Sequence, residues 1–265
     1  MGATPWRFES SREHFLDPRG TGARRAKPTA IVERSATTRD QDPEFVRQAF
    51  SAIAERYALT NHVLSLGIDV LWRRRVARMV AASDPRRVLD LATGSGDLAA
   101  AVARTCGEQC EVTGVDFCLP MLAVARARGI FPLLAADGTR LPFADDTFDA
   151  LTIGFGLRNM ESWERAVAEM ARVLRPGGLL VILDFSLPRA PWLRASYRFY
   201  LHRVLPKIAG ALTGNTAAYR YLGESIERFP AGDVMGDLLR SGGFAGIEAC
   251  ALCGGIASTY RAEKA

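Results

Sequence analysis

Short apolar runs alternate with segments of helical spacing through the middle of the chain. The apolar runs predict strands over residues 87–91, 111–116, 131–135, 148–154 and 179–184. Between them, helical spacing predicts helices after Gly96 and over residues 120–128 and 163–174. Strands that alternate with helices in this way form a parallel sheet that is buried on both faces. The central pattern therefore predicts an α/β fold with a mostly parallel sheet.

The segments that flank this central part predict further helices and a hairpin. Residues 43–82 have helical spacing that breaks near Gly67. Residues 188–225 are mostly helical in pattern and rich in aromatic side chains, so we expect them to cover the strand ends as a lid. The last segments predict a helix over residues 233–239 and strands over residues 247–252 and 255–262. Because a tight connection joins these two strands, the sheet is expected to end in an antiparallel hairpin.

The stretch that follows the first predicted strand carries the clearest chemistry. Asp90 lies near the end of that strand, and the turn Gly94-Ser95-Gly96 precedes a helix start. Glycine has no Cβ, so a ligand can lie directly on the backbone there, facing the free N–H groups of the helix start. Asp116 ends the next strand, where a carboxylate can accept hydrogen bonds from both hydroxyls of a ribose. These residues predict a ligand that contains a nucleoside.

Asp90 separates two classes of ligand that suit this turn. Residues 94–99 match the dinucleotide pattern G-x-G-x-x-G/A, which favours a pyrophosphate. A carboxylate just before the turn would repel a pyrophosphate, but it would attract the ammonium and sulfonium of S-adenosylmethionine (SAM). The residues therefore favour SAM. An NAD(P)-dependent oxidoreductase, or a nucleotide-binding protein without catalysis, is the alternative from a different class.

Four candidate positions share one place in the predicted fold. Asp90, Asp116, Asp137 and Gly154 all fall at the carboxyl ends of predicted strands. Ligands of parallel sheets bind outside the carboxyl ends of the strands. The sequence therefore predicts that these positions converge on one binding site.

Composition is typical of a globular protein with one large domain. The chain has 265 residues and is 48% apolar, which supports a sizeable core. We expect residues 43–265 to form a single domain, since residues 1–42 have no hydrophobic period and predict a disordered basic tail. Five cysteines form no even disulfide framework, and no apolar run is long enough to span a bilayer. A cytoplasmic location is therefore expected.

Several sequence blocks resemble known enzymes. Residues 88–99, 141–149 and 174–178 resemble the class I SAM-dependent methyltransferases in general. Residues 50–72, 154–159, 219–226 and 254–261 resemble one branch of that class, the ubiquinone/menaquinone biosynthesis C-methyltransferases. The resemblance covers about residues 45–264. It implies a Rossmann-like sheet with N-terminal helices and a helical lid.

The resemblance also implies an activity and a set of cofactor contacts. The activity is methyl transfer from SAM to a ring carbon of a prenylated quinol, either demethylmenaquinol or the 2-methoxy-6-polyprenyl-benzoquinol of ubiquinone synthesis. The family's cofactor positions fall on Ser95, Asp116, the pair Asp137-Gly138, and Gly154. Asp137 can accept a hydrogen bond from the adenine amino group, whereas Gly154 offers no side-chain contact. A SAM methyltransferase for another small or lipophilic acceptor is the first alternative.

The chemistry of such a reaction requires a stabilised anion. A quinol carbon attacks the sulfonium methyl poorly until the adjacent hydroxyl, with a pKa of ~10, ionises. A nearby cation would stabilise that anion. The resemblance places Arg158 in the catalytic region, and because arginine stays protonated we expect Arg158 to stabilise the oxyanion rather than to remove a proton. We expect Tyr57 and Asn61 to bind the other ring oxygen, and no metal to be required.

The net charge of +5 bears on the partners of the chain. Much of this charge falls in the tail, and no groove of interleaved aromatic and basic residues is evident, so we expect no nucleic-acid partner. An RNA methyltransferase is a further alternative. In the predicted lid, tyrosines stand among the bases Arg194, Arg198, Arg203, Lys207 and Arg220, a composition that favours peripheral contact with the inner face of a membrane. A homodimer is also compatible with the sequence.

Overall fold

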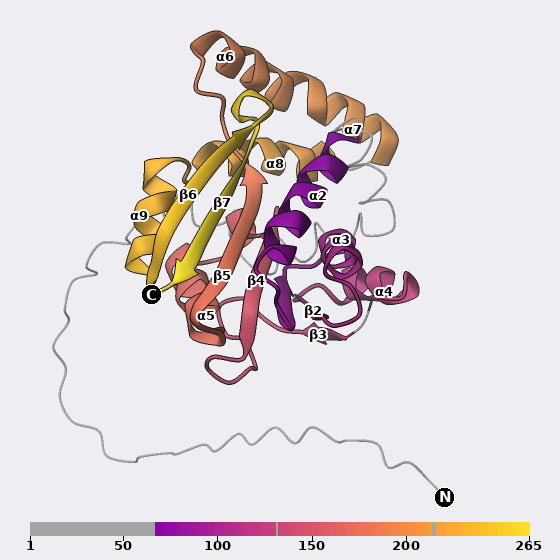
Figure 1. Cartoon of the computed structure of the whole chain (residues 1–265). Coiled ribbons are helices and arrows are strands. Elements are labelled where there is room, and N and C mark those ends of the chain that lie inside the picture. The colour runs from indigo at the N-terminus through magenta and orange to yellow at the C-terminus, as the bar shows by residue number, and fades with distance from the viewer. Residues whose placement is uncertain (1–66, 131, 214–215) are drawn as a thin grey trace, which may run out of the picture. The chain divides into compact units, whose positions relative to one another are not determined.

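The computed structural model describes residues 67–130, 132–213 and 216–265. The expected tail over residues 1–42, the helical piece predicted before Gly67, and the candidate residues Tyr57 and Asn61 lie outside these described residues. The described part of the chain forms one seven-stranded sheet with helices around it (Figure 1).

Helices and strands mostly alternate up to residue 185 of the described chain, which then continues through a run of helices to a final pair of strands. The α-helices are α2 Ile68–Ala81, α3 Asp97–Cys106, α4 Leu119–Ala127, α5 Trp163–Val173, α6 Pro191–Phe199, α7 Leu205–Thr213, α8 Thr216–Arg228 and α9 Asp233–Ser241. The strands are β1 Arg87–Leu91, β2 Glu111–Asp116, β3 Leu133–Ala135, β4 Phe148–Gly154, β5 Leu174–Phe185, β6 Phe244–Leu252 and β7 Ala257–Lys264. The short helices η2 Leu157–Asn159 and η4 Cys253–Gly255 and the π-helical turn η3 Tyr200–Val204 join them.

The strands lie in the order β3-β2-β1-β4-β5-β7-β6. β1 pairs in parallel with β2 and β4, and β2–β3 and β4–β5 are also parallel. β7 runs antiparallel between β5 and β6. The mostly parallel sheet and the antiparallel C-terminal hairpin predicted from the sequence are both confirmed. Because β1 to β5 all point the same way, their carboxyl ends meet at one edge of the sheet.

The sheet is buried on both faces because the side chains of its central strands alternate between two apolar clusters. In β5, Leu180 is fully buried in the cluster that α5 and α9 complete. Its neighbour Val181 is fully buried in the opposite cluster, which includes side chains of α2 and α3. Figure 1 shows α2 crossing the second of these faces. The alternation explains why the strands are near-continuous apolar runs in the sequence.

Strand β5 begins earlier than the sequence predicts. Phe148 pairs with Leu174 and Ala150 pairs with Leu179, so residues 175–178 bulge out of the ladder. Gly177 takes a φ of 72° in this bulge, a left-handed conformation that glycine adopts at little cost. The turn expected at residues 175–178 is therefore built into the strand, and α5 ends at Val173 instead of residue 174.

Helices α6 to α8 lie beyond the carboxyl ends of β4 and β5 (Figure 1). A small apolar cluster holds them, with Tyr197 of α6, Leu205 of α7 and Ile226 of α8 buried together against Phe185 of β5. None of the described helices has both the length and the hydropathy needed to cross a bilayer. The arrangement is compatible with the expected lid, whose movement stays a prediction.

Replacing Leu180 by Ala should destabilise the fold strongly. The side chain is 0% exposed in the middle of the sheet, so its loss should leave a cavity that costs about 2–5 kcal/mol of unfolding free energy. Urea denaturation followed by circular dichroism measures this loss. Leu71→Ala is the matched control, because Leu71 is 58% exposed on α2 and its truncation should change the free energy by less than about 0.5 kcal/mol. Equal losses in the two variants would contradict the assignment of the core.

Candidate active site

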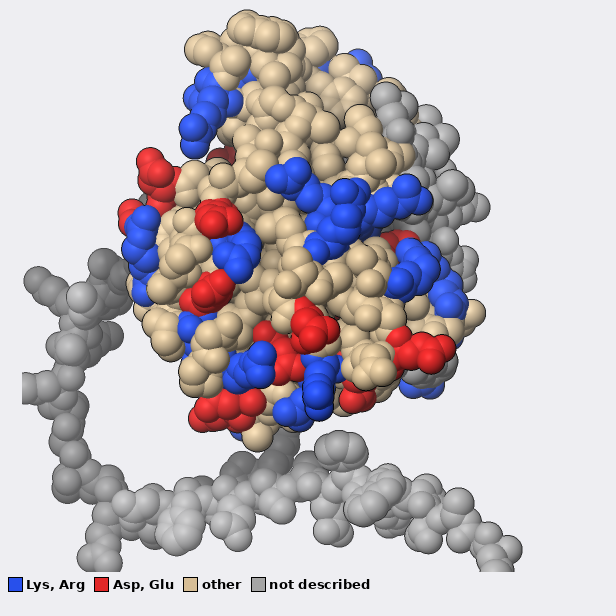
Figure 2. Space-filling view, in the orientation of Figure 1, with Lys and Arg blue, Asp and Glu red and all other residues tan. Residues whose placement is uncertain are grey.

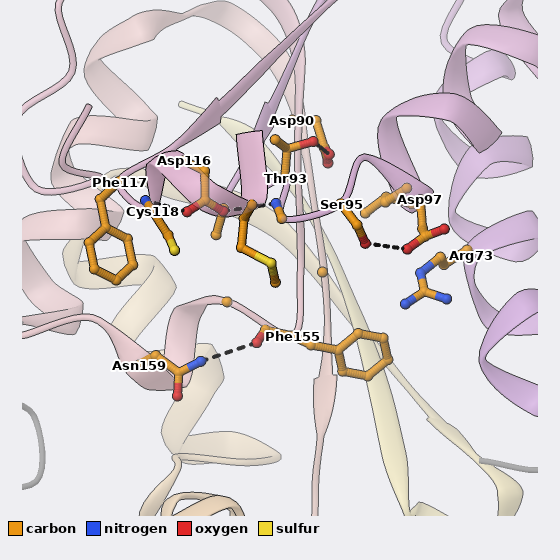
Figure 3. Close-up of a pocket in the computed structure, with 16 residues that line it drawn as sticks. Arg73, Asp90, Thr93, Ser95, Asp97, Asp116, Phe117, Cys118, Phe155 and Asn159 are labelled. Carbon is orange, nitrogen blue, oxygen red and sulfur yellow. Dashed lines mark hydrogen bonds between the residues drawn. The ribbon is translucent and has the colours of Figure 1, made fainter. Parts of the chain in front are cut away.

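A pocket opens at the carboxyl ends of β1, β2 and β4 (Figure 3). Its empty space is about 660 Å³ when the open solvent at its mouth is included. The lining residues are Arg73, Asp90, Ala92, Thr93, Gly94, Ser95, Asp97, Leu98, Asp116, Phe117, Cys118, Met121, Gly154, Phe155, Gly156 and Asn159. Strand ends and the turn after β1 thus supply most of the wall, as the sequence predicts.

Asp90 lies near the carboxyl end of β1 and is 1% exposed. One of its carboxylate oxygens accepts a 2.6 Å hydrogen bond from the hydroxyl of Thr93, and the other accepts one of 2.6 Å from Thr152 of β4. Burial raises the pKa of Asp90 to about 6, although both hydroxyls and the charge of Arg73 act to lower it. A cation that enters the pocket would favour the ionised form.

Asp116 joins the end of β2 to the turn after β1. Its two oxygens accept 2.8 Å hydrogen bonds from the backbone N–H groups of Gly94 and Cys118. Burial raises the pKa of Asp116, and these backbone donors act against that rise. Each carboxylate oxygen has a second lone pair, so Asp116 can still accept hydrogen bonds from ligand hydroxyls.

The turn between β1 and α3 has the left-handed geometry that its glycines allow. Gly94 and Gly96 take φ values of 56° and 79°. Gly94 lines the pocket, whereas Gly96 starts α3 behind it, where an added Cβ would lie 2.8 Å from Cγ1 of Ile130. Ser95 is buried, and its hydroxyl donates to the carboxylate of Asp97 at 2.7 Å. Gly96 therefore shapes the turn without belonging to the described lining.

Gly154 ends β4 and lines the pocket opposite the turn. An added Cβ at this position would lie 3.0 Å from Cδ2 of Leu98, the first apolar side chain of α3. The missing side chain therefore keeps β4 close to α3 and leaves the pocket floor open.

Arg73 is a lining residue that sequence reasoning missed. Its guanidinium pairs with Asp69 one turn earlier on α2 and lies 5.7 Å from the ring centroid of Phe155. The neighbouring Arg74 and Arg75 are exposed, as expected for a basic run on a helix surface. In the sequence, Asp69 four residues before Arg73 was the one sign that this arginine is paired. Only the packing of α2 shows that Arg73 is the arginine that faces the pocket (Figure 3).

Asp137 and Gly138 lie near the pocket but outside its described lining. The backbone N–H of Ala136 donates to the carbonyl oxygen of Asp116, which brings this loop to the end of β2. The exposed carboxylate of Asp137 accepts hydrogen bonds from the backbone N–H and the hydroxyl of Thr139. Gly138 is buried against Met160, whose Cε would lie 2.6 Å from an added Cβ. A contact between Asp137 and a ligand stays a prediction.

Arg158 is buried at the carboxyl edge of the sheet, outside the described pocket lining. Its guanidinium donates to a carboxylate oxygen of Asp184 at 2.6 Å and to the carbonyl oxygen of Phe155 at 2.5 Å. It also lies 5.3 Å from the ring centroid of Phe185. The structure therefore gives Arg158 a carboxylate partner that the sequence did not reveal.

Asn159 connects the pocket to the helices above it and was also missed by sequence reasoning. It lines the pocket, and its amide donates a 3.4 Å hydrogen bond to the carbonyl oxygen of Phe155. Its side-chain oxygen accepts a 3.2 Å hydrogen bond from the hydroxyl of Tyr221 on α8. Asn159 is the last residue of the block 154–159 that resembles the quinone C-methyltransferases, but nothing in the sequence favours it over its neighbours.

Comparisons with known proteins agree with this geometry. A solved SAM-dependent methyltransferase from Thermotoga maritima, described as a possible histamine N-methyltransferase, matches with a TM-score of 0.60 at 19% identity, covering 82% of this chain and 99% of that one. It supports the fold alone. A demethylmenaquinone methyltransferase from Thermus thermophilus is 48% identical over 200 residues, 74% of this chain and 90% of that protein.

A second relative extends over more of the chain. The demethylmenaquinone methyltransferase of Streptomyces avermitilis is 43% identical over 227 residues, 85% of this chain and 97% of that protein. The profile of the ubiE/COQ5 methyltransferase family matches residues 36–264, which include both sides of the pocket. The resemblance, the fold class and SAM as the cofactor are thereby confirmed, and an NAD(P) oxidoreductase is excluded. The chain belongs to the ubiE/COQ5 methyltransferase family.

Proposed function

We propose that the protein transfers the methyl group of SAM to a ring carbon of demethylmenaquinol. The relatives that are 48% and 43% identical both carry the name demethylmenaquinone methyltransferase, and this observation carries the choice of substrate. The pocket supports the choice of cofactor, since two buried carboxylates, Asp90 and Asp116, suit a cationic nucleoside better than a pyrophosphate.

In this proposal different residues of the pocket bind different groups of SAM. Asp90 attracts the ammonium group, and Asp116 accepts hydrogen bonds from the ribose hydroxyls. Arg73 is the cation of the described lining, and it can pair with the methionine carboxylate. Asp137 and Gly138 lie next to Asp116 and are proposed to contact the adenine. The sulfonium methyl would then face the end of β4, where Gly154 leaves space.

The acceptor would bind above β4 and β5, beneath α6 to α8. Reaction requires the ring carbon, the methyl and the sulfur in line, and most of the rate would come from holding them so. Arg158 is proposed to stabilise the quinol oxyanion, in an aromatic setting that strengthens charge interactions. Tyr57 and Asn61 are proposed to bind the other ring oxygen.

Methyl transfer from labelled SAM tests this function directly. Dithionite-reduced demethylmenaquinol and the reduced benzoquinol precursor are offered separately, with the oxidised quinones as controls. We expect label in the lipid with demethylmenaquinol, because only the reduced ring can form the nucleophilic anion. Label with the benzoquinol alone would change the assigned substrate. SAM binding without label in either quinol would contradict the proposal and leave another acceptor as the substrate.

Affinity for SAM should fall below neutral pH. The pKa of Asp90 is about 6, and a cationic ligand binds the ionised form, so binding should be strong above this value and weaken as Asp90 is protonated. At pH 5 only about a tenth of the carboxyl is ionised, which predicts a Kd about tenfold higher than at pH 8. Isothermal titration calorimetry with SAM across this range measures the change.

Asp90→Asn is the matched variant for that titration. It should bind SAM more weakly at pH 8 and lose the dependence on pH between 5 and 8. The folded-state pKa is raised, so ionised Asp90 destabilises the unliganded protein increasingly as pH rises through about 6. The Asn variant should therefore melt at a higher temperature than the wild type at pH 8, with a smaller difference at pH 5. An unchanged pH dependence in the variant would contradict this role of Asp90.

A second part of the proposal is that α6 and α7 form a lid surface that rests on an anionic membrane. Trp192, Phe199 and Ile208 are 73%, 64% and 45% exposed on these helices. Residues 186–213 contain no Asp or Glu, and five exposed bases stand among them: Arg189, Arg194, Arg198, Arg203 and Lys207. In Figure 2 the surface over α6, at the top, is mostly uncharged with basic side chains at its border. Exposed aromatics beside bases are typical of interfacial helices.

Sedimentation with lipid vesicles tests this surface. The protein should bind vesicles of phosphatidylglycerol and phosphatidylcholine, and binding should weaken with added salt because the attraction is partly electrostatic. The double variant Trp192→Ala/Phe199→Ala should bind several-fold less. Val234→Ala on α9 is the control, since Val234 is 64% exposed but lies outside this surface. Equal binding by the wild type and the double variant would contradict the assignment.

A further inference from the structure

Asp184 is a third buried carboxylate, besides Asp90 and Asp116, at the edge of the sheet that carries the pocket. It lies near the carboxyl end of β5 and is 1% exposed. Its Oδ1 accepts hydrogen bonds from the guanidinium of Arg158 at 2.6 Å and from the N–H of Phe185 at 2.8 Å. Its Oδ2 is buried without a hydrogen-bond partner among the described residues. Leaving such an oxygen unpaired costs free energy, so a donor that arrives there is bound with a gain.

This carboxylate lies beside the pocket. Phe155 and Gly156 line the pocket at the end of β4, and the N–H of Phe155 donates a 2.7 Å hydrogen bond to the carbonyl oxygen of Leu183, the residue before Asp184. The rings of Phe155 and Phe185 lie 4.6 Å apart between centroids. The end of β5 that carries Asp184 therefore adjoins the pocket wall that Phe155 forms.

The charged and titratable groups around Asp184 come from three elements. Burial raises the pKa of Asp184, and Arg158 of η2 acts to lower it. Tyr260 of β7 has a pKa raised by burial and, to a smaller extent, by the charge of Asp184. Burial also raises the pKa of Tyr197 on α6, which lies close enough to Arg158 to sense its charge. Both tyrosines therefore stay neutral near neutral pH, so Asp184 is the carboxylate of this group that a proton can reach first as the pH falls.

We propose that Oδ2 of Asp184 accepts the proton of the quinol hydroxyl next to the carbon that is methylated. This inference rests on the proposed function. The O–H bond breaks and its electron pair stays on the ring oxygen, from which charge spreads into the ring. The ring carbon then forms a bond to the methyl of SAM while the C–S bond breaks, and that pair of electrons goes to sulfur as a neutral thioether. The same ring carbon afterwards loses its hydrogen to water as a proton, and Asp184 returns its own proton to the ring oxygen.

Because Asp184 is paired with Arg158, the proton transfer does not change the total charge buried at this site. Before transfer the site holds a guanidinium and a carboxylate. After transfer it holds a guanidinium, a neutral acid and a quinolate, so the sum of the buried charges is unchanged. Creating an additional uncompensated charge in such a site would be costly. The charge of Arg158, no longer balanced by Asp184, then stabilises the quinolate, which gives Arg158 the oxyanion role expected from the sequence.

The Asp184→Asn variant tests this role when kcat is measured from pH 5 to 9 with SAM and quinol saturating. In the wild type, kcat should rise with pH to a plateau as Asp184 ionises. In the variant, kcat near neutral pH should fall by about 100-fold or more. The rise of kcat with pH that is due to the ionisation of Asp184 should also disappear. Asp90 also titrates in this range, but it acts on SAM binding, and saturating SAM removes its effect from kcat.

Two measurements keep the inference independent of folding and of the substrate assignment. Ser186→Ala is the matched control. This buried side chain lies just past the end of β5 and binds Gly255 and Ser258 rather than the Arg158 pair, so its variant should keep the wild-type pH profile. The Asp184→Glu variant should have a lower kcat than the wild type, but its kcat should still rise with pH on the acid side of the profile. An Asn variant that binds SAM with kcat near the wild-type value overturns the inference, as does a wild-type kcat that is flat over this range. A wild type that methylates neither quinol would instead contradict the proposed function.

Discussion

The pocket depends on the register between β1 and β4, which fixes a buried carboxylate between two hydroxyls. Asp90 and Thr152 are direct partners in the parallel ladder, and the 2.6 Å hydrogen bond between their side chains follows from that pairing. A slip of one strand by one residue would put these two side chains on opposite faces of the sheet. Thr93 then reaches back from the turn to the other oxygen, so the start of the turn is tied to the strand before it. The shape of the ligand site is therefore a consequence of strand pairing.

Asp116 on the neighbouring strand is also a buried carboxylate held by hydrogen bonds, but its donors are backbone N–H groups. Its hydrogen bond from Gly94 ties the end of β2 to the turn that Asp90 anchors, so the pocket wall is closed by carboxylates that the protein itself satisfies. Asp184 differs, since one of its oxygens has no donor among the described residues. In the proposed function the two satisfied carboxylates orient the cofactor, and the incompletely satisfied one lies on the side proposed for the acceptor. The proposed division of tasks among the three carboxylates therefore follows a difference in hydrogen bonding on one sheet edge.

The parts of the site that sequence predicted are local, and the missed parts are not. Asp90, Gly94 and Asp116 lie in strand–turn–helix units whose pattern fixes both their structure and their place at the sheet edge. Arg73 reaches the pocket only because α2 packs across the sheet, and an exposed neighbour such as Arg74 has the same local sequence. The partner of Arg158 lies 26 residues away on β5, a separation over which periodicity carries no information. For the same reason the sequence predicts that the last two strands form a hairpin, but it does not predict that β7 rather than β6 pairs with β5.

The carbonyl oxygen of Phe155 is where these non-local contacts meet. Phe155 has a φ of 59°, a left-handed conformation that a bulky residue adopts only when its surroundings impose it. Its carbonyl oxygen accepts hydrogen bonds from both Arg158 and Asn159, and Asn159 is in turn bound by Tyr221 of α8. Contacts from β5 and from the helices above the sheet therefore act on the same strained residue of the pocket floor. The hydrogen bond from Tyr221 fixes the side chain of Asn159, so α8 is linked through this residue to the floor of the pocket.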